Sequence, residues 1–248
     1  NNKISQKQRG VVAFYGKNWR NGSITNITMA ASSLGSNFAN SLIEKKSKGG
    51  NVLSDNTTTN YIEEESFKLS HILPLNDKHG LNMGMGLVRN SSLIEQDSLS
   101  DDVKDHTQEL LRAYVYVKDQ IRFGKRITLE PGLRLTSPLS GFSLALEERL
   151  RLGISLFKNL ELNLAYGQYD QYISSFAAFD QFSNSFYYWN VIDNDKSKPL
   201  RSYHNVLSLA YSKETIEWKI EAFNRTTSGI ERLSVENNEL LFMYGVGR

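Results

Sequence analysis

The sequence predicts an all-β protein built from antiparallel strands that run up and down in chain order. Three observations support this prediction. Apolar and polar residues alternate with a period of two over many segments, which is the side-chain pattern of β-strands. One face of these segments is almost purely aliphatic, whereas the other is charged or polar. The connections between segments alternate between very short turns and long polar stretches.

The alternation is clearest in three successive runs, at residues 127–135, 144–156 and 160–169. The polar face of these runs holds six charged residues that we expect to line an inner wall: Glu130, Arg134, Glu147, Arg149, Arg151 and Glu161. Carboxylates beside guanidinium groups also suggest catalysis or a phosphate clamp, but no nucleophile or tuned base accompanies them. An ionic network is therefore the favoured interpretation.

Five further strands are expected ahead of these runs. They cover residues 10–19, 23–34, 61–73, 81–88 and 109–121. Asn21-Gly22 is a tight hairpin signal, and further short turns are expected at 74–80 and 123–126. The polar stretches 35–60 and 89–108 are too long for ordinary connections in a compact domain, so we expect long loops there.

The longest excursion covers residues 173–201 and is the best candidate for ligand binding. It holds seven aromatic residues in a polar setting: Phe176, Phe179, Phe182, Phe186, Tyr187, Tyr188 and Trp189. Aromatic rings are costly to leave in water unless they pack together or meet a ligand, and their faces suit sugar rings or planar chelates. The alternatives are a loop that packs on itself and membrane-interface aromatics.

Two strands follow the excursion, at residues 203–211 and 216–225, around a turn at 212–215. Residues 240–248 are expected to lie at or just before another strand.

Two environments explain the contrast between the faces. A water-soluble sandwich buries its aliphatic face in a core, whereas a membrane barrel turns that face to lipid and lines a wet lumen with charges. Short turns on one rim and long loops on the other are typical of an up-and-down transmembrane β-barrel, and Greek-key sandwiches do not produce that alternation. Only the short link at 136–142 breaks it. We therefore predict the barrel.

Composition excludes several classes of protein. The net charge of +2 comes from nearly balanced acidic and basic residues, so no strongly basic surface points to nucleic acid. The absence of cysteine excludes disulfides and thiolate metal sites. The four histidines lack metal-site spacing, and there is no P-loop and no GxGxxG motif, so we expect no metal, no cofactor and no enzyme. No apolar run approaches the roughly twenty residues of a transmembrane helix.

Several segments resemble the barrel of TonB-dependent outer-membrane receptors, particularly the large branch common in Bacteroidetes. The similarity lies, in order, in Tyr114-Val-Tyr-Val-Lys-Asp119, Leu129-Glu-Pro-Gly-Leu-Arg-Leu135, Glu147-Glu-Arg-Leu150, Leu164-Ala-Tyr-Gly-Gln-Tyr169, Lys198-Pro199 followed by His204, and Glu221-Ala-Phe-Asn-Arg225. Each piece is weak alone, but their order over 109–248 is more specific. Glu148 stands where the family usually has proline, and Lys118 where it often has glutamate, which indicates a diverged member.

The resemblance implies that residues 1–248 are a partial barrel of about ten strands from a barrel of roughly 22. We expect no plug domain, TonB box or final aromatic-ended strand in this chain. The amino end lacks a signal-peptide pattern, so we expect either a removed signal or a segment of a longer polypeptide. The implied location is the outer membrane of a Gram-negative bacterium. The implied partners are outer-membrane lipid, a TonB-type energy-transducing complex acting through a plug, and a surface lipoprotein or other outer-membrane subunits.

The leading functional hypothesis is energy-coupled uptake of a scarce nutrient, such as a ferric siderophore, a corrinoid, a saccharide or a peptide, that binds at the outer loops. One alternative is a barrel without a transport cycle that serves as a structural or docking element. A third hypothesis is a soluble carbohydrate-binding β-sandwich.

Overall fold

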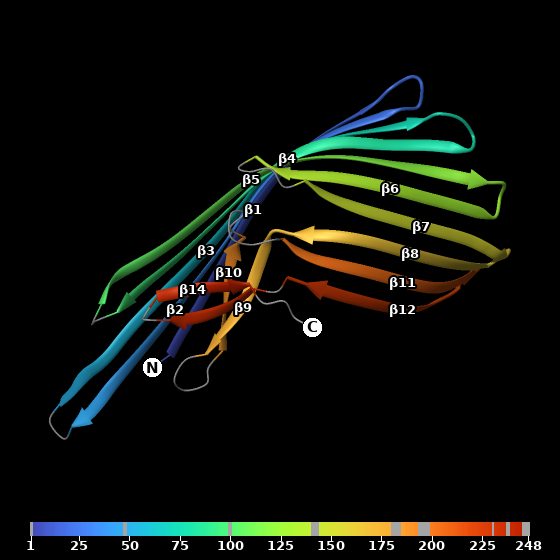
Figure 1. Cartoon of the computed structure of the whole chain (residues 1–248). Coiled ribbons are helices and arrows are strands. Elements are labelled where there is room, and N and C mark those ends of the chain that lie inside the picture. The colour runs from blue at the N-terminus through green and yellow to red at the C-terminus, as the bar shows by residue number, and fades with distance from the viewer. Residues whose placement is uncertain are drawn as a thin grey trace.

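The computed structural model describes residues 2–46, 49–98, 101–139, 144–179, 185–192, 199–229, 231–236 and 239–244, and every helix or strand assigned in them is a β-strand. Ten of these strands form one curved antiparallel sheet (Figure 1). In spatial order they are β1 (Asn2–Asn18), β2 (Ile24–Lys46), β3 (Gly49–Pro74), β4 (His79–Ser98), β5 (Asp101–Phe123), β6 (Ile127–Pro138), β7 (Ala145–Phe157), β8 (Leu160–Gln171), β11 (Leu200–Lys213) and β12 (Ile216–Ser228).

The spatial order of the sheet follows the chain, except that a separate hairpin is inserted between β8 and β11. Five short turns, at 19–23, 75–78, 124–126, 158–159 and 214–215, lie along one rim, on the right in Figure 1. Gly22 and Gly124 adopt positive φ angles of 80° and 65° in two of these turns, a conformation that glycine adopts without steric cost. The predicted up-and-down antiparallel fold is confirmed.

Two of the predicted loops are wrong. The polar stretches 35–60 and 89–108 continue as strands, so that β2 pairs with β3, and β4 with β5, far beyond the apolar segments. Backbone pairing does not require apolar side chains, and the period-two contrast fades where both faces meet water. The sequence marked where the apolar part of each strand ends, and the strand itself continues.

The aliphatic face of the sheet stays exposed. The paired residues Phe67, Leu87 and Ala113 lie in one row on this face, and Leu152, Leu164 and Leu207 lie in another. Leu87 is 45% exposed and Leu164 39%, so no second sheet seals this face within the described residues. The sandwich alternative, which buries that face, is therefore wrong.

The rims of the aliphatic face carry aromatic and charged residues. Near the short turns, the Tyr211 and Trp218 rings stack with centroids 5.7 Å apart, and Phe123 and Phe157 are exposed. On this face the run 111–121 of β5 is apolar except for Asp119, which lies near the short turns and bonds His79. At about 3.3 Å per residue and a tilt of about 45°, the run crosses about 23 Å, close to the apolar band of about 25 Å in outer-membrane barrels. Just beyond this run Arg89 pairs with Glu109 at 2.7 Å.

The excursion after β8 is an ordered hairpin in the residues that the structure describes. It consists of β9 (Ile173–Phe179) and β10 (Ser185–Val191), which lie within the curve of the sheet (Figure 1). The strand expected near 240–248 corresponds to β14 (Glu239–Tyr244), which pairs with β13 (Glu231–Glu236) and not with the main sheet. No helix in the described part of the chain has the length and apolarity to cross a bilayer.

Candidate functional site

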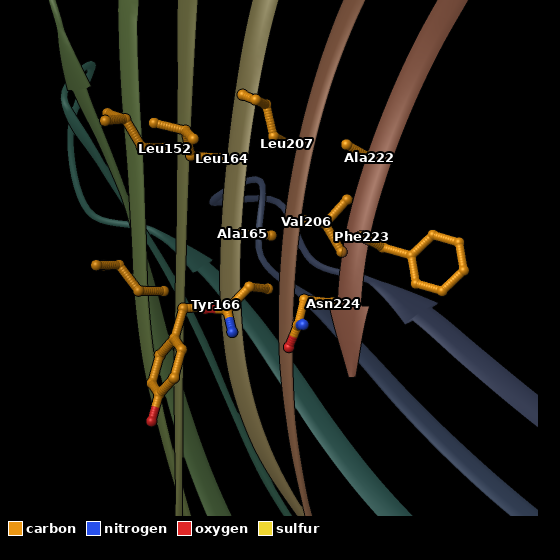
Figure 2. Close-up of a pocket in the computed structure, with 11 residues that line it drawn as sticks. Leu152, Leu164, Ala165, Tyr166, Val206, Leu207, Ala222, Phe223 and Asn224 are labelled. Atoms are coloured by element: carbon orange, nitrogen blue, oxygen red, sulfur yellow. The ribbon is translucent and has the colours of Figure 1, made fainter. Parts of the chain in front are cut away.

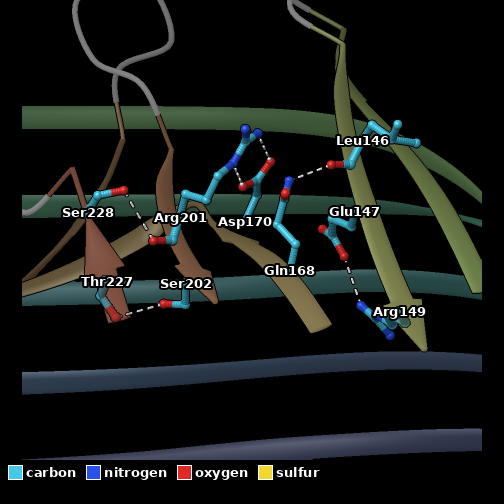
Figure 3. A network of polar contacts seen from close by, with 9 residues as sticks. All are labelled: Leu146, Glu147, Arg149, Gln168, Asp170, Arg201, Ser202, Thr227 and Ser228. Atoms are coloured by element: carbon cyan, nitrogen blue, oxygen red, sulfur yellow. Dashed lines mark hydrogen bonds and ion pairs between the residues drawn. The ribbon is translucent and has the colours of Figure 1, made fainter. Parts of the chain in front are cut away.

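The predicted inner-wall charges lie together on the polar face of β6 and β7. Cross-strand pairing sets Glu130 opposite Arg151 and Arg134 opposite Glu147. Glu130 accepts from Lys118 Nζ at 3.3 Å, and Arg151 Nη1 lies 3.9 Å from the same carboxylate. Arg149 Nη2 donates to Glu147 Oε2 at 2.8 Å (Figure 3). Among the described residues, four of the six predicted side chains thus form ion pairs on this face, namely Glu130, Glu147, Arg149 and Arg151.

Glu161 is the most isolated of the six charged candidates. It occupies the same face on β8, opposite Ser155 and Ala210, and its side chain is exposed. Within the described residues it forms no ion pair. It extends the polar wall without joining the network.

Tyrosines and arginines cover the glycines of β4 on the inner wall. Gly86 pairs directly with Tyr114, and a Cβ at Gly86 would lie 2.5 Å from the Tyr114 ring. The Arg134 guanidinium lies 3.8 Å from the centroid of the same ring. Glycine in β4, tyrosine in β5 and arginine in β6 therefore form one continuous stack across three strands. Side chains from β5 and β6 therefore cover this part of the wall, because the glycines of β4 offer no side chains of their own.

The β9–β10 hairpin is bonded to the inner wall through its second strand. The Asn60 side chain donates to Trp189 O at 2.9 Å and accepts from Trp189 N at 2.8 Å, as a neighbouring strand would. Ser92 Oγ donates to Asn190 Oδ1 at 2.8 Å and accepts from Val191 N at 3.0 Å. Four backbone or side-chain groups of β10 are thus satisfied by β3 and β4, strands that precede it by about a hundred residues.

A small buried core lies beneath this docked strand. Ile94, Leu110, Val191 and Ile192 are each at most 2% exposed. Asn90, which is fully buried, donates to Glu64 at 3.0 Å and accepts from Arg112 at 2.6 Å. The bonded polar groups of β10 and the packed apolar groups beneath it therefore hold the hairpin against the wall.

Two tyrosines complete the docking surface. Burial is the main reason that the pKa of Tyr172 rises to about 12, and its ring lies 4.6 Å from the Arg112 guanidinium. Burial also raises the pKa of Tyr188, while a hydrogen bond with the Thr58 side chain acts in the opposite direction. Both groups lie beyond the ends of the strand segments that carry the aliphatic face.

The seven aromatic candidates for ligand binding differ in their exposure and in whether the structure describes their side chains. Tyr187 is 59% exposed, whereas Tyr188 and Trp189 are partly buried against the wall. Phe176 and Phe179 belong to β9 and Phe186 to β10, but their side chains lie outside what the structure describes, as does Phe182 altogether. Sequence reasoning missed the wall residues that receive the hairpin, because Asn60 and Ser92 sit in polar stretches that were expected to be loops.

A second polar cluster joins β7, β8, β11 and β12 at the ends opposite the short turns. Arg201 binds Asp170 through two hydrogen bonds of 2.8 and 2.9 Å, and the Asp170 side chain is fully buried. Gln168 Nε2 donates to Leu146 O at 2.6 Å, and the Ser202 and Thr227 hydroxyls lie 2.8 Å apart (Figure 3). These contacts fix the strand ends from which the hairpin departs.

The aliphatic face also carries hollows, but their lining suits lipid chains. One of about 530 Å³ is lined by leucines of β7, β8 and β11, and the small Ala222 of β12 lies at one end of this row (Figure 2). Asn205 and Asn224 are its main polar side chains. Such a hollow in an outward sheet face fits acyl chains rather than a specific solute. Among the described residues no three His, Asp or Glu side chains gather as metal ligands.

The sheet has the fold of outer-membrane receptors and importers. The pyoverdine outer membrane receptor FpvA from Pseudomonas aeruginosa PAO1 matches 98% of this chain and 40% of its own, with a TM-score of 0.64 and 10% identity. The RagAB peptide transporter matches 98% of this chain and 33% of its own, with a TM-score of 0.60 and 12% identity. The siderophore receptor PirA from Pseudomonas aeruginosa matches 98% of this chain and 51% of its own, with a TM-score of 0.55 and 13% identity.

This chain therefore spans a third to a half of the length of these three structures. At 10–13% identity the likeness shows the fold alone. Neither a protein-family model nor a curated protein matches the sequence.

Proposed function

We propose that this chain is part of a TonB-dependent receptor in the outer membrane of a Gram-negative bacterium, diverged from the Bacteroidetes branch. The observation that carries the proposal is the single curved sheet with an exposed aliphatic face outside and a charged face inside, in the fold of outer-membrane receptors and importers. Water-filled lumens require polar inner faces, and lipid requires apolar outer ones.

In this proposal the protein imports a scarce nutrient and makes or breaks no covalent bond. A plug domain outside these residues occupies the lumen of the complete barrel, of roughly 22 strands. The ionic wall formed by Glu130, Arg134, Glu147, Arg149 and Arg151 contacts it, and a TonB-type complex supplies the energy. The nutrient is a siderophore, a corrinoid, a saccharide or a peptide; the similar structures include a peptide transporter and siderophore receptors.

The docking of the β9–β10 hairpin reduces the number of aromatic residues that we propose as contacts of the nutrient. Tyr188 and Trp189 are held against the wall, whereas Tyr187 is exposed on the same strand. We propose Tyr187 as the ligand contact of β10, together with the phenylalanines of the hairpin. A surface lipoprotein is the proposed partner on the outer side.

Uptake under energy control tests the proposal. Cells with and without the full-length protein are compared for accumulation of labelled siderophores, corrinoids, oligosaccharides and peptides, before and after an uncoupler collapses the proton gradient. We expect one class to accumulate only with the protein and only in energised cells, while surface binding survives the uncoupler. Binding without energised uptake would instead support the non-transporting docking barrel.

A further inference from the structure

A cavity of about 250 Å³ on the inner wall is lined by four cationic side chains. It extends across β3 to β7, and we call it the cationic pocket. Its charged and aromatic lining consists of Lys68, Lys118, Arg134, Arg149, Tyr114 and Tyr116. All six belong to the polar face by their pairing in the sheet. The pocket therefore opens toward the lumen rather than toward lipid.

Two of the four cations are already neutralised. Lys118 pairs with Glu130 at 3.3 Å and Arg149 with Glu147 at 2.8 Å. Lys68 and Arg134 form no ion pair within the part of the chain that the structure describes. The pocket thus carries about two uncompensated positive charges in a partly enclosed site, where water screens them less than on an open surface.

The side chain of Arg134 is held in one orientation. Its guanidinium stacks on Tyr114 at 3.8 Å, and its Nε donates to Thr136 Oγ1 at 3.3 Å. These contacts leave the two terminal amino groups without a described hydrogen-bond acceptor. A planar guanidinium with its free edge presented in this way is preorganised for an oxyanion, because it donates two parallel hydrogen bonds to carboxylate or phosphate oxygens.

We propose that the cationic pocket binds one oxyanion group, a carboxylate or a phosphate, between Lys68 and Arg134. Its volume lies below the about 300–1,000 Å³ typical of pockets for whole drug-sized ligands, so it suits one charged group. The group comes either from a free solute in the lumen or from an acidic side chain of polypeptide inside it. The proposal rests on the proposed function only for placing this face against a wet lumen.

The first arm tests a free solute. The full-length protein in detergent is unfolded thermally at constant ionic strength, with sodium succinate or phosphate replacing chloride. We expect the Tm to rise by about 1 °C in the wild type, as for a ligand that contributes about 1 kcal/mol to a protein of several hundred residues. The rise disappears in Lys68→Gln/Arg134→Gln and survives in Arg151→Gln, which removes a cation of the same wall outside the pocket.

The second arm tests an acidic side chain. A carbodiimide couples an amine to a carboxylate in direct contact, and mass spectrometry identifies the joined peptides. A peptide joined at Lys68 identifies polypeptide as the source of the oxyanion, and Lys118 joined to Glu130, 3.3 Å away, is the positive control in the same sample.

The proposal is overturned if succinate and phosphate leave the Tm unchanged and Lys68 couples to nothing while Lys118 couples to Glu130. If Lys68 is not coupled to any peptide, two further results also overturn the proposal. One is a Tm rise that persists in the double variant, and the other is a Tm rise that vanishes in Arg151→Gln. Neither arm requires uptake, so the pocket and the proposed function fail independently.

Discussion

At the scale of single residues, the inner wall depends on a glycine that makes room for a tyrosine. A Cβ at Gly86 would lie 2.5 Å from both the Tyr114 ring and Phe67 O, which is closer than real side chains approach. We expect Gly86→Ala to displace Tyr114 and Arg134 and to lower stability by about 1–3 kcal/mol, the usual cost of overpacking. Thermal unfolding of the purified protein measures the loss.

Gly132→Ala is the matched control for Gly86→Ala. Gly132 lies on the same face of β6, but a Cβ there would meet its nearest atoms only at 3.6 Å. We expect this variant to unfold within about 0.5 kcal/mol of the wild type, as surface substitutions usually do. If both variants lost the same stability, the cost would come from replacing glycine in a strand backbone and not from displacing the Tyr114 ring.

Tyr172 offers a second residue-scale prediction, through pH. Its hydroxyl is buried without a hydrogen-bond partner among the described residues, and burial raises its pKa to about 12 from the usual value of about 10. The neutral form is therefore favoured in the folded state, so its stabilising contribution is complete below pH 10 and is lost as the pH rises toward 12. Tyr172→Phe removes this dependence and leaves stability at pH 7 equal or higher by about 1 kcal/mol.

Thermal unfolding of the wild type and Tyr172→Phe from pH 8 to pH 12 checks this sign. Other titrating groups are common to both proteins, so the difference between the two Tm values isolates Tyr172. That difference should be constant to about pH 10 and then shift against the wild type. A difference that is flat to pH 12 would mean that the hydroxyl is solvated.

Single residues also show how far sequence reasoning reaches. The period of two alone predicts that five charged residues share one face, and the pairing of β6 with β7 sets them on the same face: Glu130, Arg134, Glu147, Arg149 and Arg151. The stacking of Arg134 on Tyr114 was not foreseen. It depends on register between β5 and β6, which an alternating pattern leaves open by any even shift.

At the scale of elements, the hairpin's position depends on a few buried polar side chains. Asn60 satisfies both backbone groups of Trp189 and is 2% exposed. We expect Asn60→Ala to leave those two groups unpaired and to weaken docking by about 1–3 kcal/mol. Hydrogen exchange at the amides of 187–191 should then accelerate by about ten- to a hundredfold, since each 1.4 kcal/mol is tenfold.

Asn37→Ala is the matched control for Asn60→Ala. Asn37 is an exposed asparagine on the aliphatic face of the neighbouring strand β2, beyond its apolar part, and it bonds only Thr59 at 3.4 Å. Its removal should leave exchange in β10 unchanged. Unchanged protection of β10 in Asn60→Ala would show that the apolar core beneath the hairpin holds it without the asparagine.

The hairpin and the extended strands are where sequence reasoning stopped, and the physical reason is the same. The contact between Asn60 and Trp189 joins residues 129 positions apart, and nothing local in either segment encodes it. Likewise, a strand loses its alternating pattern where its apolar part ends but keeps its backbone partner. Alternation of apolar and polar residues arises only where the two faces of a strand meet different environments. It therefore cannot predict a strand whose two faces both meet water.

At the scale of the whole molecule, the proposed barrel requires the two faces of one sheet to meet two different solvents. A pair of substitutions on β8 tests this requirement. Leu164 lies on the aliphatic face in line with Leu152 and Leu207, and Glu161 lies on the polar face of the same strand. If lipid covers the first face, Leu164→Arg costs about 2–4 kcal/mol near the bilayer midplane. Glu161→Arg replaces one hydrated charge by another and costs little, because the lumen is wet.

Urea unfolding of both variants in lipid bilayers, with heat-modifiable gel mobility as a measure of assembly, compares the two costs. We expect Leu164→Arg to lower the unfolding midpoint and the fraction of the compact form, and Glu161→Arg to match the wild type. In a sheet with water on both sides, each substitution would be tolerated. In a sheet whose polar face was packed against a dry core, Glu161→Arg would be the more damaging of the two, so the order of the two losses assigns the solvents.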